Sequence, residues 1–275
     1  MFSGGIREPE FAGELYPQDA EELAAYFNRL MHDFLGDDEI PLNVQGAILP
    51  HDSPLFCGET QARLYAEISV PERVLILHPR TALPGKGAAF SHHTGIRTPF
   101  GDARVATDLL KALADAGLAT CIDELQDSEH AAEVVIPFLQ ASRHGVEIAA
   151  LGVGPLEPDE VAKLGDGIAE ILNAGDPSRT LILALCNFNV AADSRSVEKA
   201  DDIALEAIEA FDAQGLLHAC KEHKLTLTGA PAVAVALHAC KVLGCSDATV
   251  VDHADSGETS GVGEDITGYA SVYLL

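Results

Sequence analysis

The chain has 275 residues, of which 47% are hydrophobic, so it is long enough to bury one large core or two modest ones. Forty-three acidic residues against 17 basic ones give a formal net charge of −26. Such a charge repels nucleic-acid phosphates and anionic lipid head groups, so we expect neither nucleic acid nor a membrane as a partner. Such an excess of acidic residues is typical of highly soluble proteins or of proteins adapted to a saline cytoplasm.

The sequence predicts a cytoplasmic protein. It contains no run of about 18 uninterrupted apolar residues, and residues 1–11 mix Gly, Arg, Glu and Pro where a signal peptide needs an apolar core. Six cysteines without a Cys-x-x-Cys pair are expected to be reduced core thiols, and Cys240 and Cys245 in particular to be small buried hydrophobes. The others are Cys57, Cys121, Cys186 and Cys220.

Hydrophobic periodicity predicts alternating helices and strands along the chain. The first element is an amphipathic helix over residues 20–34, with acidic residues in its first turn. Short apolar runs typical of strands buried on both faces follow at residues 44–49, 74–77, 146–153, 180–186 and 248–251. Helical patterns lie between them at residues 58–68, 107–116, 128–139, 158–172, 196–211 and 232–243. Residues 83–100 are expected to be a long irregular stretch that borders a pocket.

This alternation predicts an α/β protein, a three-layer α/β/α sandwich around a central mostly parallel or mixed sheet. No linker or repeat interrupts residues 1–275, so we expect one domain. Ligands in such folds lie beyond the carboxyl ends of the strands. The segments to inspect for chemistry are therefore residues 50–53, 78–81, 187–190 and 252–257.

Several short phrases occur in the order and spacing typical of one family. The phrase Gly-Ala-Ile-Leu-Pro-His ends at His51, and further phrases occupy residues 12–17, 98–101, 129–130 and 268–271. In these phrases the chain resembles the Memo family over nearly its whole length. The resemblance implies a fold like that of class III extradiol ring-cleaving dioxygenases, iron or copper binding with redox chemistry, and, for many prokaryotic members, association with a radical-SAM protein.

The residues that the resemblance places at the family metal site are largely replaced in this chain. His51 matches the first family histidine, but the second falls on Thr81. The aspartate and histidine of a Ser-Ser-Asp-x-Ser-His phrase fall on Asn187 and Val190, and the family cysteine falls at or beside Thr228. Because Asn, Thr and Val cannot compensate the charge of a divalent cation, we expect no metal cofactor. The first hypothesis is thus a Memo-like binding or accessory protein that uses the strand-end pocket.

The alternative hypothesis is a metal-dependent oxidoreductase with a relocated histidine site for iron, copper or zinc. Such a site would combine His51 with His78, His130 or His253, and the metal candidates are His51, His78 and His253. Each of these histidines alone is also typical of a neutral, hydrogen-bonded imidazole at a loop end. Glu133, one turn after His130, would orient that imidazole or form a helix-surface pair with it.

Two features are given no catalytic role. Asp52-Ser53-Pro54 is ordinary turn chemistry rather than part of a hydrolase triad, and His92-His93 is expected to be a solvated loop pair. The expected partner is a small molecule or a protein, the latter a radical-SAM protein by analogy. The pocket candidates are His51, His78, Thr81, His130, Glu133, Asn187, Val190, Thr228 and His253.

Overall fold

The computed structural model describes residues 2, 4–32, 34, 40–260 and 265–275. The strands are β1 (Ile6–Arg7), β2 (Gly46–Leu49), β3 (Arg73–Pro79), β4 (Ala88–Phe90), β5 (Gly95–Thr98), β6 (Gly101–Val105), β7 (Ala119–Cys121), β8 (Glu147–Val153), β9 (Thr180–Leu185), β10 (Val190–Ala191), β11 (Ala248–Asp255) and β12 (Ile266–Leu274). The helices are α1 (Ala20–His32), α2 (Pro54–Glu67), α3 (Thr107–Asp115), α4 (His130–Ser142), α5 (Pro158–Asn173), α6 (Ser194–Glu209), α7 (Ala213–His223), α8 (Ala230–Val242) and α9 (Ser256–Ser260).

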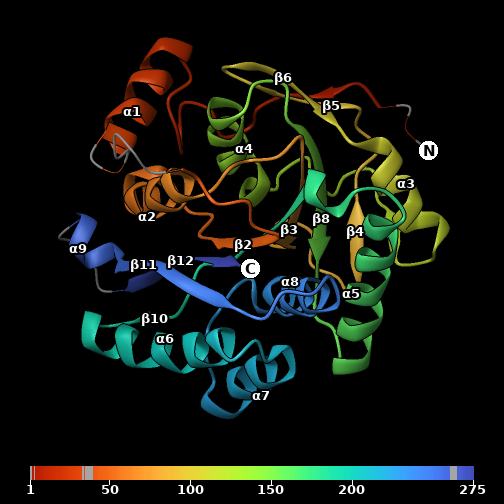
Figure 1. Cartoon of the computed structure of the whole chain (residues 1–275). Coiled ribbons are helices and arrows are strands. Elements are labelled where there is room, and N and C mark those ends of the chain that lie inside the picture. Colours follow the sequence, from red (N-terminus) through yellow and green to blue (C-terminus); the bar gives the residue numbers. More distant parts are fainter. Residues whose placement is uncertain (1, 3, 33, 35–39, 261–264) are drawn as a thin grey trace.

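All the described strands belong to one mixed sheet in the order β1-β5-β6-β8-β3-β9-β2-β12-β10, with β11 beside β12 and with β4 joining β7 to β8 (Figure 1). Its centre is the parallel set β8, β3, β9 and β2. These strands are continuous apolar runs, and their side chains are buried on both faces, as parallel strands require. The predicted α/β fold is therefore confirmed.

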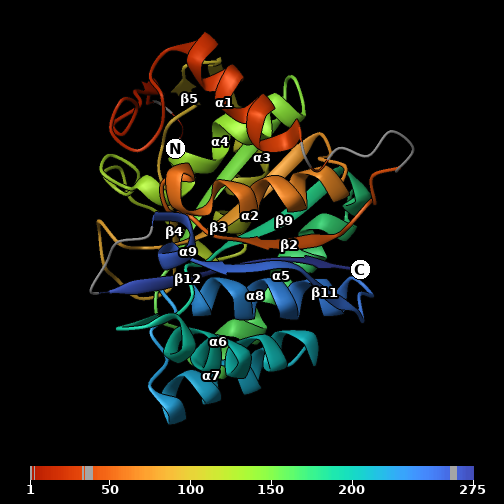
Figure 2. The same ribbon diagram turned by 90° about the vertical axis from the view of Figure 1, so that its left-hand side faces the viewer.

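Helices cover both faces of the sheet. In Figures 1 and 2, α2 and α4 lie on one face with α1 outside them, and α8 and α5 lie on the other with α6 and α7 outside. The apolar character of α8 on all sides fits its place between the sheet and α5. Ser53 caps the start of α2, where Pro54 occupies the first turn, so the chain turns sharply from the end of β2 into a helix.

The parallel pairing brings the predicted segments of interest to one edge of the sheet. Leu49 of β2 pairs with Leu185 of β9, and Leu77 of β3 pairs with Ala184. The carboxyl ends of β2, β9 and β3 therefore lie side by side. The segments at these ends are residues 50–53, 187–190 and 78–81.

Several elements of the fold differ from the expectation, among them the short strands β1, β6, β7 and β10 and the short helix α9. β12 lies between β2 and β11 and was not predicted, because its partners at residues 46–48 and 248–255 lie elsewhere in the chain. The stretch at residues 83–100, expected to be irregular, contains β4 and β5, which are short strands held by β8 and β6. Helix α7 also has no counterpart among the predicted helices.

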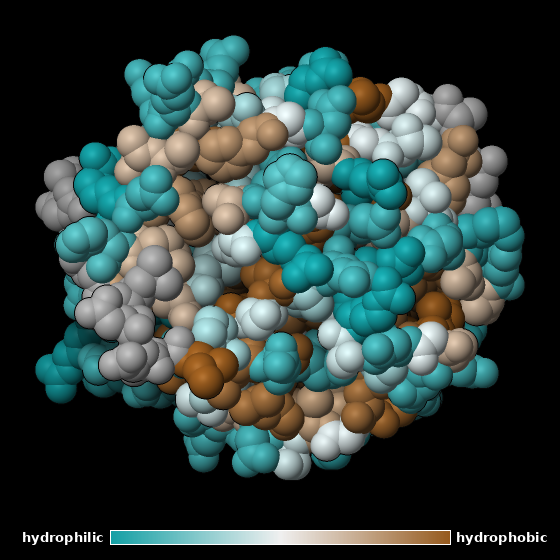
Figure 3. Space-filling view, turned by 45° about the horizontal axis from the view of Figure 1, so that its top comes forward, coloured by the Kyte–Doolittle hydropathy of each residue, from teal (hydrophilic) through white to brown (hydrophobic). Residues whose placement is uncertain are grey.

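One face of the molecule is largely hydrophilic. Figure 3 shows a face on which hydrophilic residues predominate, with hydrophobic residues in a hollow near its centre and along its lower side. In the described part of the chain, every helix is too short or too polar to span a bilayer.

Candidate functional site

His51 lies at the centre of the polar strand-end edge. It follows β2 by two residues, and its side chain is only 2% exposed. Its Nε2 lies 3.0 Å from the Thr228 hydroxyl, and its backbone N–H donates to Asn187 Oδ1 at 2.9 Å. The structure therefore brings together His51, Asn187 and Thr228, which the sequence placed in three separate segments.

Backbone contacts hold Asn187 and Thr228 in place beside His51. The Thr228 N–H donates to the Asn187 carbonyl at 3.1 Å, and the Asn187 N–H donates to the Thr228 hydroxyl at 3.3 Å. Thr228 stands directly before Gly229, the N-cap residue of α8. A Cβ atom on Gly229 would lie 2.0 Å from the Leu185 carbonyl oxygen. Only glycine fits this close approach, so the start of α8 is locked against the end of β9.

The imidazole of His51 is neutral at physiological pH. Burial, and to a smaller degree the neighbouring His130, lowers the pKa of His51 to about 3. The ring centroids of His51 and His130 lie 5.5 Å apart. Nδ1 of His51 is buried and has no hydrogen-bond partner among the described residues, so one acceptor or donor position of this ring is open.

A buried carboxylate, which the sequence analysis did not include in the site, lies beside His130. Glu129 is 1% exposed, and its oxygens accept from the Thr81 N–H at 2.8 Å, the Thr81 hydroxyl at 2.6 Å and the Ala82 N–H at 3.2 Å. Burial opposes its ionisation, but nearby His78 and these hydrogen bonds keep the pKa of Glu129 below its usual value. Its Oε1 lies 3.8 Å from Nδ1 of His130. The Glu129-His130 phrase was the sequence signal for it.

His78 is fully buried near this carboxylate, but both of its ring nitrogens are already engaged. Nδ1 lies 2.8 Å from the Pro79 carbonyl oxygen, and Nε2 lies 2.7 Å from the Gln126 side-chain amide. Burial lowers the pKa of His78, and the nearby Glu129 carboxylate acts in the opposite direction. This satisfied buried histidine is the alternative that the sequence analysis kept open for each candidate.

Glu133 does not form the expected helix-surface pair. Its side chain is 1% exposed, and its carboxylate is taken up by the N-terminal segment rather than by His130. It forms an ion pair with Arg7 and accepts from the Phe11 N–H and from the Tyr16 hydroxyl, both at 2.8 Å. Glu133 therefore anchors residues 7–16 on α4.

His253 belongs to a different polar cluster. On β11, its Nε2 lies 2.8 Å from Oδ2 of Asp201, a fully buried carboxylate on α6. Oδ1 of Asp201 accepts from both the backbone and the side-chain amide of Asn189, each at 2.9 Å. Val190, the next residue, is 42% exposed on β10. These contacts join α6 to the sheet, and His253 has a structural role in this cluster.

Asp201 was not among the predicted site residues, although the sequence contains a signal for it. Val197, Ala204, Leu205 and Ile208 are the other buried residues of α6, and Asp201 occupies the same apolar face at helical spacing. A carboxylate at a core-facing position must have a partner. That position, among residues otherwise typical of a solvated acidic face, predicts a buried hydrogen-bonded network.

The residues at the strand ends do not fit the iron or copper that the family resemblance implies. In residues 2–32, 40–260 and 265–275, leaving out the few undescribed positions, no group of three or more His, Cys, Asp or Glu side chains is placed to hold a metal ion. The groups in contact with His51 are a hydroxyl, an amide and a second imidazole, and the buried Glu129 carboxylate beside His130 is already hydrogen-bonded to Thr81 and Ala82. Metal binding by His51 with His78 or His253 stays a prediction.

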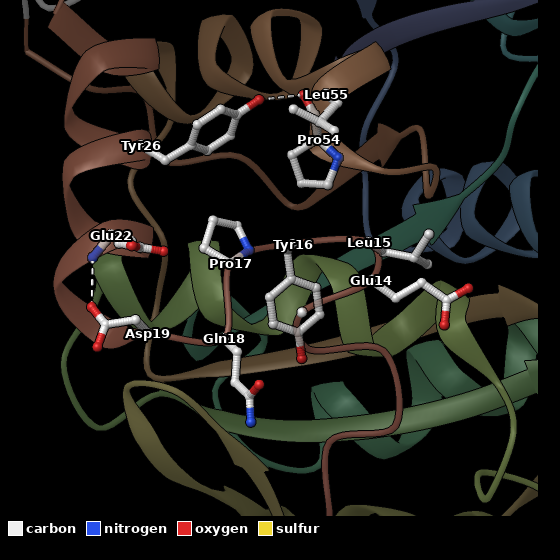
Figure 4. Close-up of a pocket in the computed structure, with 11 residues that line it drawn as sticks. Glu14, Leu15, Tyr16, Pro17, Gln18, Asp19, Glu22, Tyr26, Pro54 and Leu55 are labelled. Atoms are coloured by element: carbon white, nitrogen blue, oxygen red, sulfur yellow. Dashed lines mark hydrogen bonds between the residues drawn. The ribbon is translucent and has the colours of Figure 1, made fainter.

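A cavity of about 640 Å³ lies beside this edge, between α1 and the start of α2 (Figure 4). Pro54 and Leu55 of α2 face residues 14–17 across it, and the Tyr26 hydroxyl donates to the Pro54 carbonyl at 2.8 Å. The Ser53 hydroxyl donates to the Leu15 carbonyl at 2.7 Å, so one wall is fixed two residues after His51. The lining comprises Gly13, Glu14, Leu15, Tyr16, Pro17, Gln18, Asp19, Glu22, Tyr26, Pro54 and Leu55.

The large mixed sheet, its two helical layers and the polar strand-end edge define an α/β protein consistent with the Memo and extradiol-dioxygenase type of fold. The sequence profile of the family described as "Memo-like protein" matches residues 7–273. The chain belongs to the Memo-like family.

Similar proteins agree with this assignment. The chain is 27% identical to a "MEMO1 family protein" of Aquifex aeolicus, covering 98% of this chain and 99% of the relative. It is 28% identical to one of Methanosarcina mazei, with the same two coverages. The crystal structure of the uncharacterized protein JW3007 from Escherichia coli K12 superposes with a TM-score of 0.53 at 12% identity, covering 83% of this chain and 98% of that one. That likeness concerns the fold.

The buried anchor gives a first prediction. Replacing Glu133 (Glu133→Ala) leaves the Arg7 guanidinium buried without its counter-charge, which we expect to lower the free energy of unfolding by about 3–5 kcal/mol. Urea unfolding at neutral pH measures this loss. The control is Glu10→Ala, since Glu10 is exposed and contributes only its backbone N–H to the anchor. Equal stability of the two variants would contradict the assignment.

The Asp201 contact gives a second prediction. Its hydrogen bond raises the pKa of His253 above the ordinary value of about 6.5, so the contribution of His253 to stability is complete below about pH 6.5 and falls as pH rises through the folded-state pKa. We expect His253→Gln to cost more stability at pH 6 than at pH 8.5 in paired urea titrations. His144→Gln, at an exposed position, serves as the control. A cost that stays constant with pH would count against the ion pair.

Proposed function

We propose that this protein is a Memo-type binding or accessory protein that works without the metal of its family. One observation carries the proposal: Thr228 and Asn187, which stand where the resemblance expects a thiol and a carboxylate, hydrogen-bond to His51 directly. These neutral groups give His51 partners without a cation. The site is thus suited to hydrogen bonding with a ligand rather than to redox chemistry.

The chemistry of the edge indicates what such a ligand contributes. The open Nδ1 of His51, with its neutral ring, accepts or donates one hydrogen bond according to the tautomer. His130, 5.5 Å away between ring centroids, is partly exposed and presents a second imidazole. A small molecule with both a donor and an acceptor would match this pair.

The nearby cavity, whose lining includes neither His51 nor His130, has room for a small-molecule ligand. Its volume of about 640 Å³ lies within the roughly 300–1,000 Å³ of ordinary ligand sites. The charged residues that line it are Glu14, Asp19 and Glu22, and its lining includes no basic residue. We therefore infer that the ligand is neutral or cationic, since an anion would be repelled.

A second candidate is a metal-dependent oxidoreductase with a relocated site. The close approach of the His51 and His130 rings favours it, because two imidazoles are half of a typical borderline-metal site. Glu129 would be the nearest carboxylate, but its oxygens are already taken up by Thr81 and Ala82. The first proposal therefore accounts for more of the contacts.

Metal analysis separates the two candidates. We expect the purified wild-type protein, expressed in medium supplemented with iron, copper and zinc, to contain far less than one metal ion per chain. We expect the variant Thr81→His/Asn187→Asp/Thr228→Cys, which restores family donors around His51, to bind about one. Elemental mass spectrometry measures both.

Two further results complete this test. His51→Ala added to the restored variant should abolish its metal content, which shows that the ion occupies the intended site. Stoichiometric metal in the wild-type protein that is lost on His51→Ala would overturn the proposal in favour of the second candidate. An accessory role also predicts a protein partner, by analogy a radical-SAM protein, and co-purification from a native extract would detect it.

A further inference from the structure

The carboxyl end of α8 places two cysteines side by side. The Cys245 N–H donates to the Cys240 carbonyl at 2.9 Å, and the Gly244 N–H donates to the Lys241 carbonyl at 3.1 Å. Gly244 has the positive φ of 101° that this pattern of two bonds requires. The arrangement is a Schellman motif, in which the side chains of the first and last bonded residues characteristically touch. Here those two residues are Cys240 and Cys245.

The two thiols differ in their access to solvent. Cys240 is fully buried, and a Cβ on Gly46 at the start of β2 would lie 2.5 Å from its sulfur. Cys245 is partly exposed, because the chain leaves the helix there and continues to β11. A reagent in solution therefore reaches Cys245, whereas Cys240 is buried from solvent.

The contact between the thiols also makes their acidities unequal. A hydrogen bond from Cys240 stabilises the thiolate of Cys245 and lowers the pKa of Cys245. The same hydrogen bond, together with burial, raises the pKa of Cys240. A partly exposed thiol of lowered pKa beside a buried second thiol is the arrangement of redox-sensitive cysteine pairs.

The remaining cysteines lack this combination. Cys57 and Cys186 are buried, and burial raises the pKa of each thiol. Burial also raises the pKa of Cys121, and it raises the pKa of Cys220 to about 11. Cys245 is thus set apart from them by both its acidity and its neighbour.

We propose that Cys245 and Cys240 form an oxidisable dithiol site that reacts with hydroperoxides, Cys245 being the attacking and Cys240 the resolving residue. The Cys245 thiolate attacks the peroxide, the O–O bond breaks, and the alkoxide or hydroxide leaves and takes up a proton, which produces a sulfenic acid. The Cys240 thiol then attacks that sulfur, and the disulfide forms as water leaves. Two thiols are oxidised for each hydroperoxide reduced, and a dithiol reductant restores both by exchange.

Lys241 allows the bond to be detected directly. Trypsin cleavage after Lys224 and Lys241 separates residues 225–241, which contain Cys240, from residues 242–275, which contain Cys245. After treatment of the full-length reduced protein with one equivalent of hydrogen peroxide and alkylation, we expect these two peptides to be joined, with the loss of two hydrogen atoms. The joined species should disappear after reduction with dithiothreitol.

Two variants test the assigned roles. Cys240→Ser should retain oxidation at Cys245 as a sulfenic acid that dimedone traps, whereas Cys245→Ser should yield neither the disulfide nor the adduct. The partly exposed Cys121 is the control thiol, and we expect Cys245 to react faster, since burial raises the pKa of Cys121 whereas the contact with Cys240 lowers the pKa of Cys245. Equal reaction at Cys121 and Cys245, or no joined peptides in the wild-type protein, would overturn the proposal.

Discussion

The parallel pairing of β3, β9 and β2 is the constraint on which the rest of the structure depends. These strands are apolar and buried on both faces along their middles, and polar residues gather at the edge where all three strands end. His78, Asn187 and His51 reach that edge from segments far apart in the sequence. Thr228, just before α8, contacts Asn187 at this edge. The start of α4, on one face of the sheet, adds Glu129 and His130.

Burial then decides what these groups can do. A buried polar atom must have a partner, and here the partners are neutral groups of the chain itself. Thr228 hydrogen-bonds to the His51 ring, and Asn187 accepts a hydrogen bond from the His51 backbone. Gln126 hydrogen-bonds to His78, and Thr81 donates a hydrogen bond to Glu129. The groups in contact with His51 at this edge are therefore groups suited to hydrogen bonding.

Helix α8 connects the two ends of the molecule at which chemistry is proposed. It begins beside Thr228 at the strand-end edge and ends in the Schellman motif of Cys240 and Cys245. The same rule of backbone satisfaction acts at both ends. At the first, Gly229 permits contact with β9, and at the second, Gly244 turns the chain so that two thiols meet.

The sequence by itself determined the α/β class, the central strands, most of the helices and the membership of the Memo-like family, because these depend on local hydrophobic periodicity and on short phrases. It also determined that His51 would stand at a strand end. Only the tertiary structure decided which polar groups are partners. It assigned Glu133 to the N-terminal anchor and His253 to Asp201, and it made β12 a strand, because burial, pairing and contact between distant segments are properties of the folded chain rather than of any local pattern.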